Sequence, residues 1–487
     1  MLLLPLAASL TLLMACQAEP QQAPDGSPAA HSSQTSASPP RDVILLTIDT
    51  LRYDHVSSQD SASPSKTPHI DALAKQGVSY TQTYAPVSVT GPSFITLFTG
   101  LFPRRHGAVM NGFRGGNALD EAHETLTEQL KGAGFQTAAF VSGFTLRPAL
   151  GLDQGFDIYS DSSPKLRRSG TETAKAAIDW LTSLKTEDRA FLWFHTFDAH
   201  GPWTEVDEPA ATQVWTRHDH STTDRMPYHQ VIDDISDPEF YKARYARSVE
   251  HTDAQIGEII TALKNAKRYE EALIILTADH GESFTERELW FGHGTSALEE
   301  QLHVPLIVKR PGAVRAGQRS TRLTSLADIM PSVQEWLDMT QRIDLDGLSF
   351  AEAKGPGHSK LLGESSHCKD HIALTCAPLG SSGKEFAMRT NRDTILRQQR
   401  ENVSVWTRYD RSQDKHELHP KSVPETAPGK TALKAEVAWR KQHPFQGLVE
   451  LQSPQNSRLE ATSQTPAEEA SNPDWETESL KKLGYLD

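Results

Sequence analysis

The chain has 487 residues, a formal net charge of −14 and 37% hydrophobic residues. This length is enough for one large hydrophobic core and a smaller companion. Nucleic acids and anionic membrane surfaces require clustered Lys and Arg residues, which this acidic chain does not supply. We therefore expect a globular protein with a solvated acidic surface and no nucleic-acid partner.

The first sixteen residues read as an export signal. Residues 1–15 form an apolar run that is too short for a comfortable transmembrane helix. The stretch Leu13-Met14-Ala15-Cys16 resembles the bacterial lipobox, in which the thiol of Cys16 is acylated and becomes the mature N-terminus. Residues 17–40 are polar and rich in Pro, Ser, Ala and Gln, which suits a disordered tether. We expect a lipid anchor on the periplasmic or cell-surface side of a bacterial membrane; the alternative is an ordinary signal peptide with a chance Cys.

The other two cysteines, Cys368 and Cys376, lie eight residues apart. An exported compartment is oxidising enough to pair them, so they could form a disulfide that closes a loop. The chain contains no zinc-type cluster of cysteines. Any metal ion must therefore be held by oxygen and imidazole ligands.

A buried strand is predicted at the start of the folded region. Residues 42–48 form a continuous apolar run, which is typical of a strand buried on both faces of a parallel sheet, and the run ends at Asp49. A helix follows, with Thr67 as its cap, Pro68 in its first turn and Gly77 at its end. The next predicted strand covers residues 78–84.

Helices and strands then alternate along the chain, which predicts an α/β fold with a large mixed, mostly parallel sheet flanked by helices. We assign residues 41–315 to this domain. A helix at 326–339 and shorter strand-like segments predict a smaller C-terminal α+β subdomain over 316–452, and residues 453–487 form a polar tail. The predicted helix and strand pairs are 124–134 with 135–141, 172–184 with 190–197, and 253–266 with 272–278, and the C-terminal strand-like segments lie near 386–391 and 402–409.

Polar side chains follow three of the predicted strands. They are Asp49, then Asp198 with His200, then Asp279 with His280. Because open α/β sheets place their sites at the carboxyl ends of strands, these groups together indicate a metal site. Taken singly, an Asp that ends a strand often only caps the next helix.

Thr90 is predicted to begin a helix. Pro92 suits the first turn and Gly100 suits the end, so the Thr90 hydroxyl would lie among the free N–H groups of a helix N-terminus. Such a position stabilises an anion. The alternative is that Thr90 only caps the helix.

The segment TGPSFITLFTG at residues 90–100 is similar to the sulfatase signature, which reads Cys or Ser, any residue, Pro, Ser or another residue, Arg, and four residues later Thr-Gly. Other motifs come in the order found in that family: VILLTIDTLRYDHV at 43–56, FDAHGPW at 197–203, LTADHGE at 276–282 and FGHG at 291–294. The chain thus resembles the sulfatase-like family of the alkaline phosphatase superfamily from about residue 42 to about residue 350. The resemblance implies an alkaline phosphatase-like fold and a metal-dependent ester hydrolase or transferase.

Departures from the sulfatase pattern point to phosphorus chemistry. Thr90 stands at the position of the Cys or Ser that sulfatases oxidise to formylglycine, and Phe94 stands at the position of the Arg. Threonine cannot give formylglycine, so none is expected. The Gly-Lys-Trp-His stretch of sulfatases is replaced by residues 140–143, FVSG. Relatives with an unmodified Thr nucleophile act on phosphate esters, which implies phosphate mono- or diesters as substrates.

The resemblance also implies residue roles. One divalent ion (Ca, Mg, Mn or Zn) would be held by Asp49, Thr90, Asp279 and His280, with one family ligand lost because Thr50 replaces a second acid. Thr90 would attack the substrate. His200 would contact the phosphoryl oxygens or protonate the leaving group.

Three further residues are weaker candidates for substrate binding. His293 falls near the position of a conserved Lys of the family, Arg52 is better suited to a structural role than to direct contact, and Asp198 follows a strand. A second metal ion would need Asp198, His293 and either His195 or His200. We favour the arrangement with one metal ion.

Two alternative functions stay open on the sequence. Family membership alone favours a sulfuric-ester hydrolase, so the anionic ester could carry sulfate in place of phosphate. The other alternative is a catalytically weak lipoprotein that binds anionic glycans or lipids. All the expected metal-site residues are of competent types, which favours an enzyme.

Overall fold

The computed structural model describes residues 39–111, 118–203, 225–227, 230–232, 235, 237–287, 289–340, 344–351, 357–366, 385–400, 403–422 and 434. The predicted signal peptide with Cys16, almost all of the tether, Cys368, Cys376 and the polar tail lie outside these residues. Within the described part of the chain, every helix is too short or too polar to cross a membrane.

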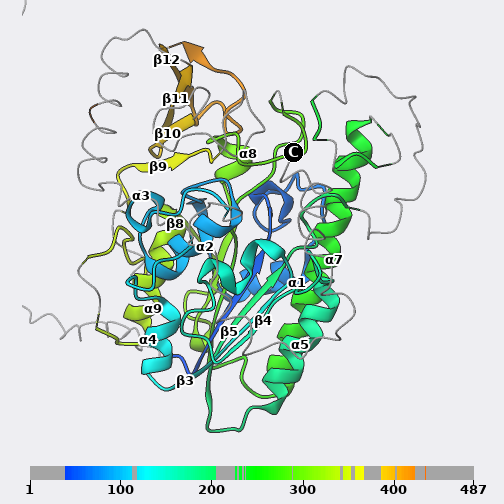
Figure 1. The fold of residues 1–487 in the computed structure, drawn as a ribbon, viewed down its shortest axis with the longest axis vertical. Helices are drawn as coiled ribbons and strands as arrows, with labels where there is room; N and C mark the ends of the chain where they lie inside the picture. The colour runs from blue at the N-terminus through cyan, green and yellow to red at the C-terminus, as the bar shows by residue number, and fades with distance from the viewer. Residues whose placement is uncertain are drawn as a thin grey trace, which may run out of the picture. The chain divides into compact units, whose positions relative to one another are not determined.

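The core is an eight-stranded sheet with the order β4-β3-β5-β1-β6-β7-β2-β8 (Figure 1). Only β7 runs antiparallel to its neighbours, so the prediction of a mixed, mostly parallel sheet is confirmed. The strands are β1 (Asp42–Ile48), β2 (Val78–Tyr84), β3 (Phe135–Val141), β4 (Ile158–Ser160), β5 (Arg189–Thr196), β6 (Ala272–Ala278), β7 (Leu306–Lys309) and β8 (Gln318–Ser325).

The helices form two groups about this sheet. In Figure 1, α1, α5 and α7 lie together on one side, and α2, α4 and α9 lie on the other. The helices are α1 (Pro68–Gln76), α2 (Thr90–Thr99), α3 (Pro103–His106), α4 (Leu126–Gly132), α5 (Gly170–Ser183), α7 (Pro238–Asn265), α8 (Glu299–Leu302) and α9 (Ile329–Trp336). Helices on both sides make β1 and β6 fully buried strands, as their continuous apolar runs predict.

Helix α7 differs most from the prediction, because it begins at Pro238 and not at residue 253. Asp237 caps its first turn by accepting a hydrogen bond from the Glu239 amide. The first half carries Lys, Arg and Glu residues, yet Tyr241 and Tyr245 are buried. Long amphipathic side chains can cover a core in this way, and the apolar stripe is then hard to recognise in the sequence.

A second, antiparallel sheet follows in the chain, with the order β13-β12-β11-β10-β9. Its strands are β9 (Leu361–Glu364), β10 (Glu385–Arg389), β11 (Asp393–Arg400), β12 (Val403–Asp410) and β13 (Lys421–Ser422). Strand β8 pairs with β2, so residues 318–325 belong to the large sheet although they follow the boundary predicted at residue 315. The small sheet is the core of the predicted C-terminal subdomain.

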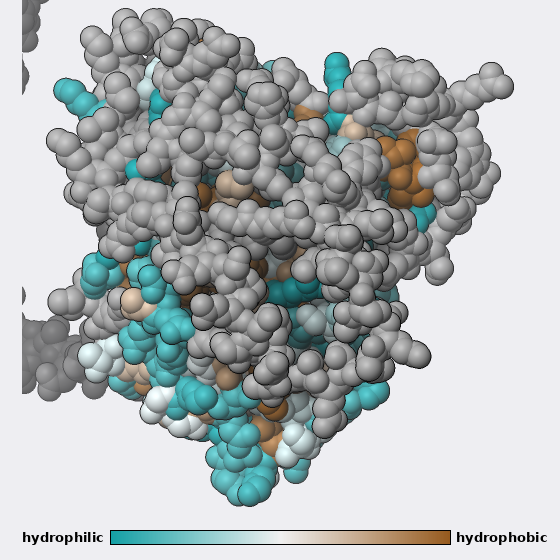
Figure 2. Space-filling model, in the orientation of Figure 1, coloured by the Kyte–Doolittle hydropathy of each residue, from teal (hydrophilic) through white to brown (hydrophobic). Residues whose placement is uncertain are grey.

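Hydrophilic side chains cover most of the described surface in the lower part of Figure 2. This agrees with the acidic composition of the chain, in which 63 Asp and Glu residues outnumber 49 Lys and Arg residues. Apolar side chains are instead gathered in the core, where most strand residues of β1, β3, β5 and β6 are buried.

His106, at the end of α3, is a buried neutral histidine. Its Nδ1 accepts the amide N–H of Ala108 at 3.2 Å, so the ring proton lies on Nε2 and faces the Thr96 hydroxyl at 3.0 Å. Burial, with a smaller contribution from His123, lowers its pKa to about 3. Because the unfolded chain binds a proton near pH 6.5 and the folded chain does not, this residue reduces stability as the pH falls from 6.5 towards 3.

We predict that His106→Gln makes the protein less sensitive to acid. Between pH 7.5 and pH 5 the native chain should lose about 2 kcal/mol more free energy of unfolding than the variant, as expected for one histidine that stays neutral 1.5 pH units below its unfolded pKa. Urea denaturation at the two pH values measures this difference. Equal losses in both proteins would show that His106 becomes protonated without cost.

Candidate active site

Asp49 and Asp279 lie side by side at the carboxyl ends of neighbouring strands. Ile48 and Ala278 are register partners and the last residues of β1 and β6, and each Asp comes directly after its strand. Ligand atoms of Asp49, Asp279 and His280 all lie within 4.8 Å of one another, and the three side chains are fully buried. In the described part of the chain, no other group of three His, Cys, Asp or Glu residues meets this distance.

The donor atoms of this group suit a divalent cation. Asp49 Oδ1 and Asp279 Oδ2 are buried and have no hydrogen-bond partner. His280 Nδ1 lies 2.8 Å from the carbonyl of Gly281. Because that carbonyl can only accept, Nδ1 carries the proton of the neutral ring and Nε2 presents a lone pair. Two unpartnered carboxylate oxygens and one imidazole nitrogen match the ligands of Mg, Ca, Mn or Zn sites.

The titration of these groups also fits a metal site. Burial, and then repulsion from Asp279, raises the pKa of Asp49 well above its ordinary value. Burial lowers the pKa of His280, which keeps its ring neutral. A buried cation would remove the cause of the raised Asp49 pKa by supplying the missing positive charge.

Thr90 is the first residue of α2, and the structure places its hydroxyl beside this group. Thr90 Oγ1 lies 3.5 Å from Asp49 Oδ2 and 3.4 Å from His280 Nε2, and the residue is 1% exposed. Gly100 ends α2 in the left-handed conformation, with φ of 67°, as its predicted position requires. Thr90 thus combines a helix N-terminus with contact to two of the expected metal ligands.

Thr50, which replaces the second acid of the sulfatase pattern, turns its side chain away from this group. Its Oγ1 donates to the carbonyl of Ala199 at 3.0 Å, and its amide donates to Asp279 Oδ1 at 3.1 Å. The backbone adopts a left-handed φ of 54°, which is unusual for a β-branched residue. Thr50 therefore orients Asp279 through its backbone.

His200 and His293 are neighbours, with ring centroids 5.0 Å apart, and their surroundings shift their pKa values in opposite directions. Burial, followed by repulsion from His293, lowers the pKa of His200 well below its ordinary value. Burial also disfavours the charged form of His293, but attraction from Glu282 outweighs it and the pKa is raised. The site thus has, beside His280, one imidazole whose neutral form is favoured and one whose charged form is favoured.

The orientation of these two rings is fixed by acceptors. His200 Nδ1 lies 2.6 Å from the carbonyl of Gly201, and His293 Nδ1 lies 3.2 Å from Glu282 Oε2. Because both partners accept, each Nδ1 carries a proton. His200 in its neutral form therefore has an accepting Nε2, whereas His293 in its charged form has a donating Nε2–H.

The structure gives Asp198 a role in supporting the fold. Its carboxylate accepts the Gly170 amide at the start of α5 at 3.0 and 3.1 Å, and the Gln255 amide at 2.6 Å. It is not part of the group formed by Asp49, Asp279 and His280. Asp198 therefore connects α5 to α7 beneath the site, and the expectation that it contacts substrate gains no support from these hydrogen bonds.

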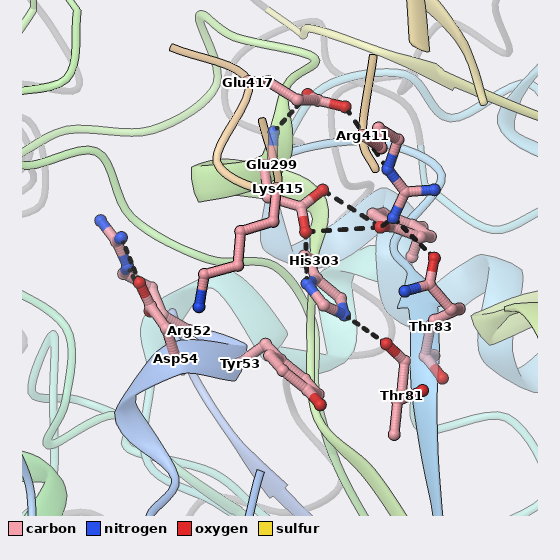
Figure 3. A network of polar contacts seen from close by, with 12 residues as sticks. Arg52, Tyr53, Asp54, Thr81, Thr83, Glu299, His303, Arg411, Lys415 and Glu417 are labelled. Carbon is pink, nitrogen blue, oxygen red and sulfur yellow. Dashed lines mark hydrogen bonds and ion pairs between the residues drawn. The ribbon is translucent and has the colours of Figure 1, made fainter. Parts of the chain in front are cut away.

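Arg52 also serves the fold. Its guanidinium donates to both oxygens of Asp54 at 2.9 and 2.7 Å, to Glu286 at 2.7 Å and to the carbonyl of Glu282 at 3.0 Å. Figure 3 shows the Arg52–Asp54 pair. With its donors engaged in this way, Arg52 holds the turn after β1 to the segment that carries Glu282, which agrees with the structural role favoured from the sequence.

Beside Arg52 is a cavity of about 560 Å³ between the turn after β1 and the residues that follow β12. Several of its charged side chains are paired with each other: Lys415 with Asp60 at 2.9 Å, and His303 with Glu299 at 2.6 Å, the latter pair being visible in Figure 3. None of the candidate metal ligands lines it. The cavity joins the C-terminal residues to the large domain and is separate from the site around Thr90.

Asn111 was not recognised from the sequence. Its Oδ1 accepts the amide N–H of Gly91, the residue after Thr90, at 2.8 Å, and the side chain is 7% exposed. The side chain of Asn111 therefore lies at the N-terminus of α2, and its amide N–H groups are donors of the kind that suit an anionic oxygen. It lies 21 positions after Thr90 in irregular structure, so no helical or strand periodicity marks it.

The family model named Sulfatase matches residues 41–339, which is more than half of the chain. The chain belongs to the sulfatase family of hydrolases. Among the most similar relatives are an ulvan-active sulfatase of Formosa agariphila, 26% identical over 58% of this chain and 52% of that protein, and the inner membrane protein YejM of Salmonella typhimurium, 25% identical over 61% of this chain and 42% of that protein. The chain thus matches about half of the length of these relatives.

Solved structures share the fold. A protein bound to its substrate D-glucosamine-2-N,6-O-disulfate has a TM-score of 0.65 and 17% identity, covering 84% of this chain and 99% of that one. A phosphonate monoester hydrolase of Agrobacterium radiobacter has a TM-score of 0.65 and 20% identity, covering 83% and 96%. These neighbours establish the alkaline phosphatase-like architecture.

Sulfatase-family enzymes use a divalent metal ion, and Asp49, Asp279 and His280 are the residues of this chain that fit one. The arginine of the sulfatase signature is replaced here by Phe94, whose ring is fully buried. It contacts Trp193 and His195, with both centroid distances 5.0 Å. An apolar contact to the core thus occupies the position at which sulfatases place a charge.

We predict that a divalent ion stabilises the protein through this site. At 100 times its dissociation constant, the ion should raise the free energy of unfolding by about 2.7 kcal/mol, and EDTA should remove the gain. Thermal unfolding with Ca²⁺, Mg²⁺, Mn²⁺ and Zn²⁺ in turn measures the effect. Asp279→Asn should lose it, because the variant lacks one carboxylate oxygen.

The matched control is Asp179→Asn, which removes an exposed acid on α5 that pairs only with exposed Lys175. This variant should keep the full metal-dependent gain in stability. A gain that survives in Asp279→Asn would place the stabilising ion somewhere else.

Proposed function

We propose that the chain is a metal-dependent hydrolase or transferase that acts on phosphate mono- or diesters with Thr90 as its nucleophile. The observation that carries this proposal is the unmodified Thr90 hydroxyl within 3.5 Å of both Asp49 and His280 at the start of a buried helix. A threonine cannot be oxidised to the aldehyde on which sulfatases depend. An alcohol nucleophile held among metal ligands and helix N–H groups instead suits direct displacement at phosphorus.

In the first step, Thr90 Oγ1 forms a bond to phosphorus while the bond from phosphorus to the leaving oxygen breaks. The hydroxyl proton goes to a neighbouring base, and the leaving oxygen takes a proton from an acid. A divalent ion, when bound, would supply positive charge that lowers the pKa of the Thr90 hydroxyl and stabilises the phosphoryl oxygens. The product is a leaving alcohol and a phosphorylated Thr90.

In the second step, water or an acceptor alcohol attacks the phosphorylated Thr90 and restores the hydroxyl. His200 suits the base of this step, because its proton is held by Gly201 and its neutral Nε2 can accept. His293 suits the acid of the first step, because Glu282 favours its charged form. This division differs from the expectation that His200 contacts the phosphoryl oxygens or protonates the leaving group.

The Lys and His of the sulfatase Gly-Lys-Trp-His stretch are absent here, so other groups would bind the phosphoryl oxygens. The Asn111 amide lies beside Thr90 because its Oδ1 is held by the Gly91 amide. His293 supplies a positive charge where the family has Lys. These groups and the N-terminus of α2 would provide the donors for the phosphoryl oxygens.

Sulfuric-ester hydrolysis is the second candidate, because named relatives and fold neighbours of this chain include sulfatases. Phosphonate monoester hydrolases share the fold equally well, so the fold does not favour sulfur over phosphorus. Thr90 favours phosphorus. A binding lipoprotein without turnover is the third candidate, and the assembled set of Thr90, Asp49, Asp279 and His280 argues against it.

We predict phosphoester turnover that depends on the Thr90 hydroxyl. Thr90→Val keeps the β-branched shape but has no hydroxyl, so turnover should fall by at least about 1,000-fold, as expected when a nucleophile is removed. Thr90→Ser keeps the hydroxyl and should retain measurable turnover. Matched aryl sulfate, aryl phosphate and diaryl phosphate substrates, assayed with several divalent ions, test both variants.

Turnover of the phosphoesters that disappears only in Thr90→Val would support the proposal. Sulfate turnover that depends on Thr90 would instead revive the sulfatase alternative. Phosphorylated Thr90 detected by mass spectrometry after acid quenching would identify the covalent step.

We also propose that the enzyme is anchored outside the cytoplasm through acylated Cys16. The lipobox-like Leu13-Met14-Ala15-Cys16 and the polar tether after it support this address. Expressed with labelled palmitate, the protein should carry the label and sediment with membranes. Cys16→Ser should lose both properties, and labelling that persists in this variant would contradict lipidation at Cys16.

A further inference from the structure

Beneath Asp49 lies a chain of buried polar groups that the proposed reaction does not use. Trp193 Nε1 donates to Thr47 Oγ1 at 2.9 Å, and Thr47 Oγ1 lies 3.0 Å from His195 Nδ1. His195 Nε2 lies 3.4 Å from Asp49 Oδ2. All four side chains are fully buried, and the parallel register of β1 and β5 pairs Thr47 directly with His195.

The identity of each group decides which way the protons point. Trp193 can only donate, so Thr47 Oγ1 accepts from it. As a metal ligand, Asp49 is a carboxylate and can only accept, and His195 Nε2 is buried with no hydrogen-bond partner. Without a proton, Nε2 would turn a lone pair towards the lone pairs of Asp49, so Nε2 carries a proton whether the ring is neutral or charged.

The Thr47 hydroxyl completes the orientation of the ring. Its single proton can go to the carbonyl of Phe194, at 3.1 Å, or to His195 Nδ1. When the ring is neutral and Nε2 carries the proton, Nδ1 accepts the Thr47 proton. Donation then runs in one direction, from Trp193 to Thr47 and from Thr47 to His195, whose Nε2 lies 3.4 Å from Asp49 Oδ2.

We propose that His195 is a positioning residue of the metal site, which directs its Nε2–H at Asp49 Oδ2 and so turns Oδ1 towards the ion. This inference rests on the proposed function, in which Asp49 is a metal ligand. Partners behind a ligand commonly fix its orientation and raise its affinity for metal. Here the partner lies inside the sheet, one strand away from Asp49.

Phe94 keeps the His195 ring in this orientation. The edge of one ring faces the plane of the other, with centroids 5.0 Å apart and planes at 82°. Phe94 also packs on Trp193, so one side chain of α2 contacts two members of the polar chain. This contact gives the replacement of the signature arginine by Phe94 a function: it excludes water and restricts rotation of His195.

The test compares two substitutions of Thr47. Thr47 is linked to the candidate ligand Asp49 only through His195. Thr47→Val keeps the shape and removes the hydroxyl, whereas Thr47→Ser keeps the hydroxyl. Affinity for Mn²⁺ is measured by calorimetry on full-length protein stripped with EDTA, without substrate. We expect Thr47→Val to weaken binding about tenfold, the lower end of the range for such partners, and Thr47→Ser to stay within about threefold of the native chain.

A second pair tests His195 directly. His195→Leu removes the donor and should weaken Mn²⁺ binding by about 10- to 100-fold, whereas His195→Gln keeps an N–H donor and should recover part of the loss. Thermal unfolding of each metal-free variant shows whether it is folded. If Thr47 or His195 served packing alone, its two variants could be less stable than the native chain. The two variants of each pair would then bind Mn²⁺ with equal affinity.

Equal Mn²⁺ affinities within both pairs would overturn the proposal. A native chain that binds none of Mn²⁺, Zn²⁺, Mg²⁺ or Ca²⁺ would overturn it as well, together with the metal site. Failure of phosphoester turnover with intact Mn²⁺ binding would instead count against the role of Thr90 and leave the positioning role of His195 supported by the affinities.

Discussion

The repulsion between two buried carboxylates governs the design of this site. The register of β1 and β6 forces Asp49 and Asp279 to be neighbours in an apolar sheet. The positive charge that can compensate Asp49 comes from nearby histidines. The two carboxylates differ in their hydrogen bonds. Asp279 Oδ1 accepts two backbone amides, from Thr50 and His280, whereas Asp49 has only long contacts to Thr90 and His195. Such a site is held in place by the fold and is incomplete without a cation.

The histidines are arranged to complement that pair. His200 and His280 are each followed by a glycine whose carbonyl fixes the ring through Nδ1. A side chain at Gly201 would collide with Gln230, and one at Gly281 would collide with the backbone of Glu300. The two glycines therefore let the chain approach closely enough to fix each ring through its Nδ1. His293 instead has the carboxylate of Glu282 at its Nδ1, and although burial disfavours its charged form, this carboxylate raises its pKa.

Much of this architecture follows from local sequence, and the rest depends on contacts across the fold. The bounds of β1 and β6 agree with the apolar runs that predict them, because strands buried on both faces leave little ambiguity. The bounds predicted for β2 and β3 also agree with the structure. The start of α7 was missed because charged residues in its first half hide the apolar pattern of its buried face. Strands β7 and β8 were not predicted; β7 is short, and most of β8 is polar and partly exposed at the sheet edge.

The candidate site shows the same division. Asp49, Asp279 and His280 follow strands, so strand order was enough to bring them together, and Thr90 was found from helix signals and the family resemblance. Asn111 could not be found because a loop returns it to Gly91. In β5, His195 reads as one residue of a buried strand, and only the register with β1 reveals that it faces Asp49.

Helix α7 has a consequence for how this site can move. Its 28 residues span roughly 42 Å, and the hydroxyl of Tyr245 in its first half donates to the Thr50 carbonyl and accepts the Arg52 amide. The turn that carries Asp49 is thus bonded to the longest helix of the described chain. The amide protons of this turn would exchange with solvent only when α7 separates from the sheet. Local fraying of the turn would not be enough to expose them. Substrate entry must then be accommodated by other segments, while the floor of the site behaves as part of the slowest-opening core.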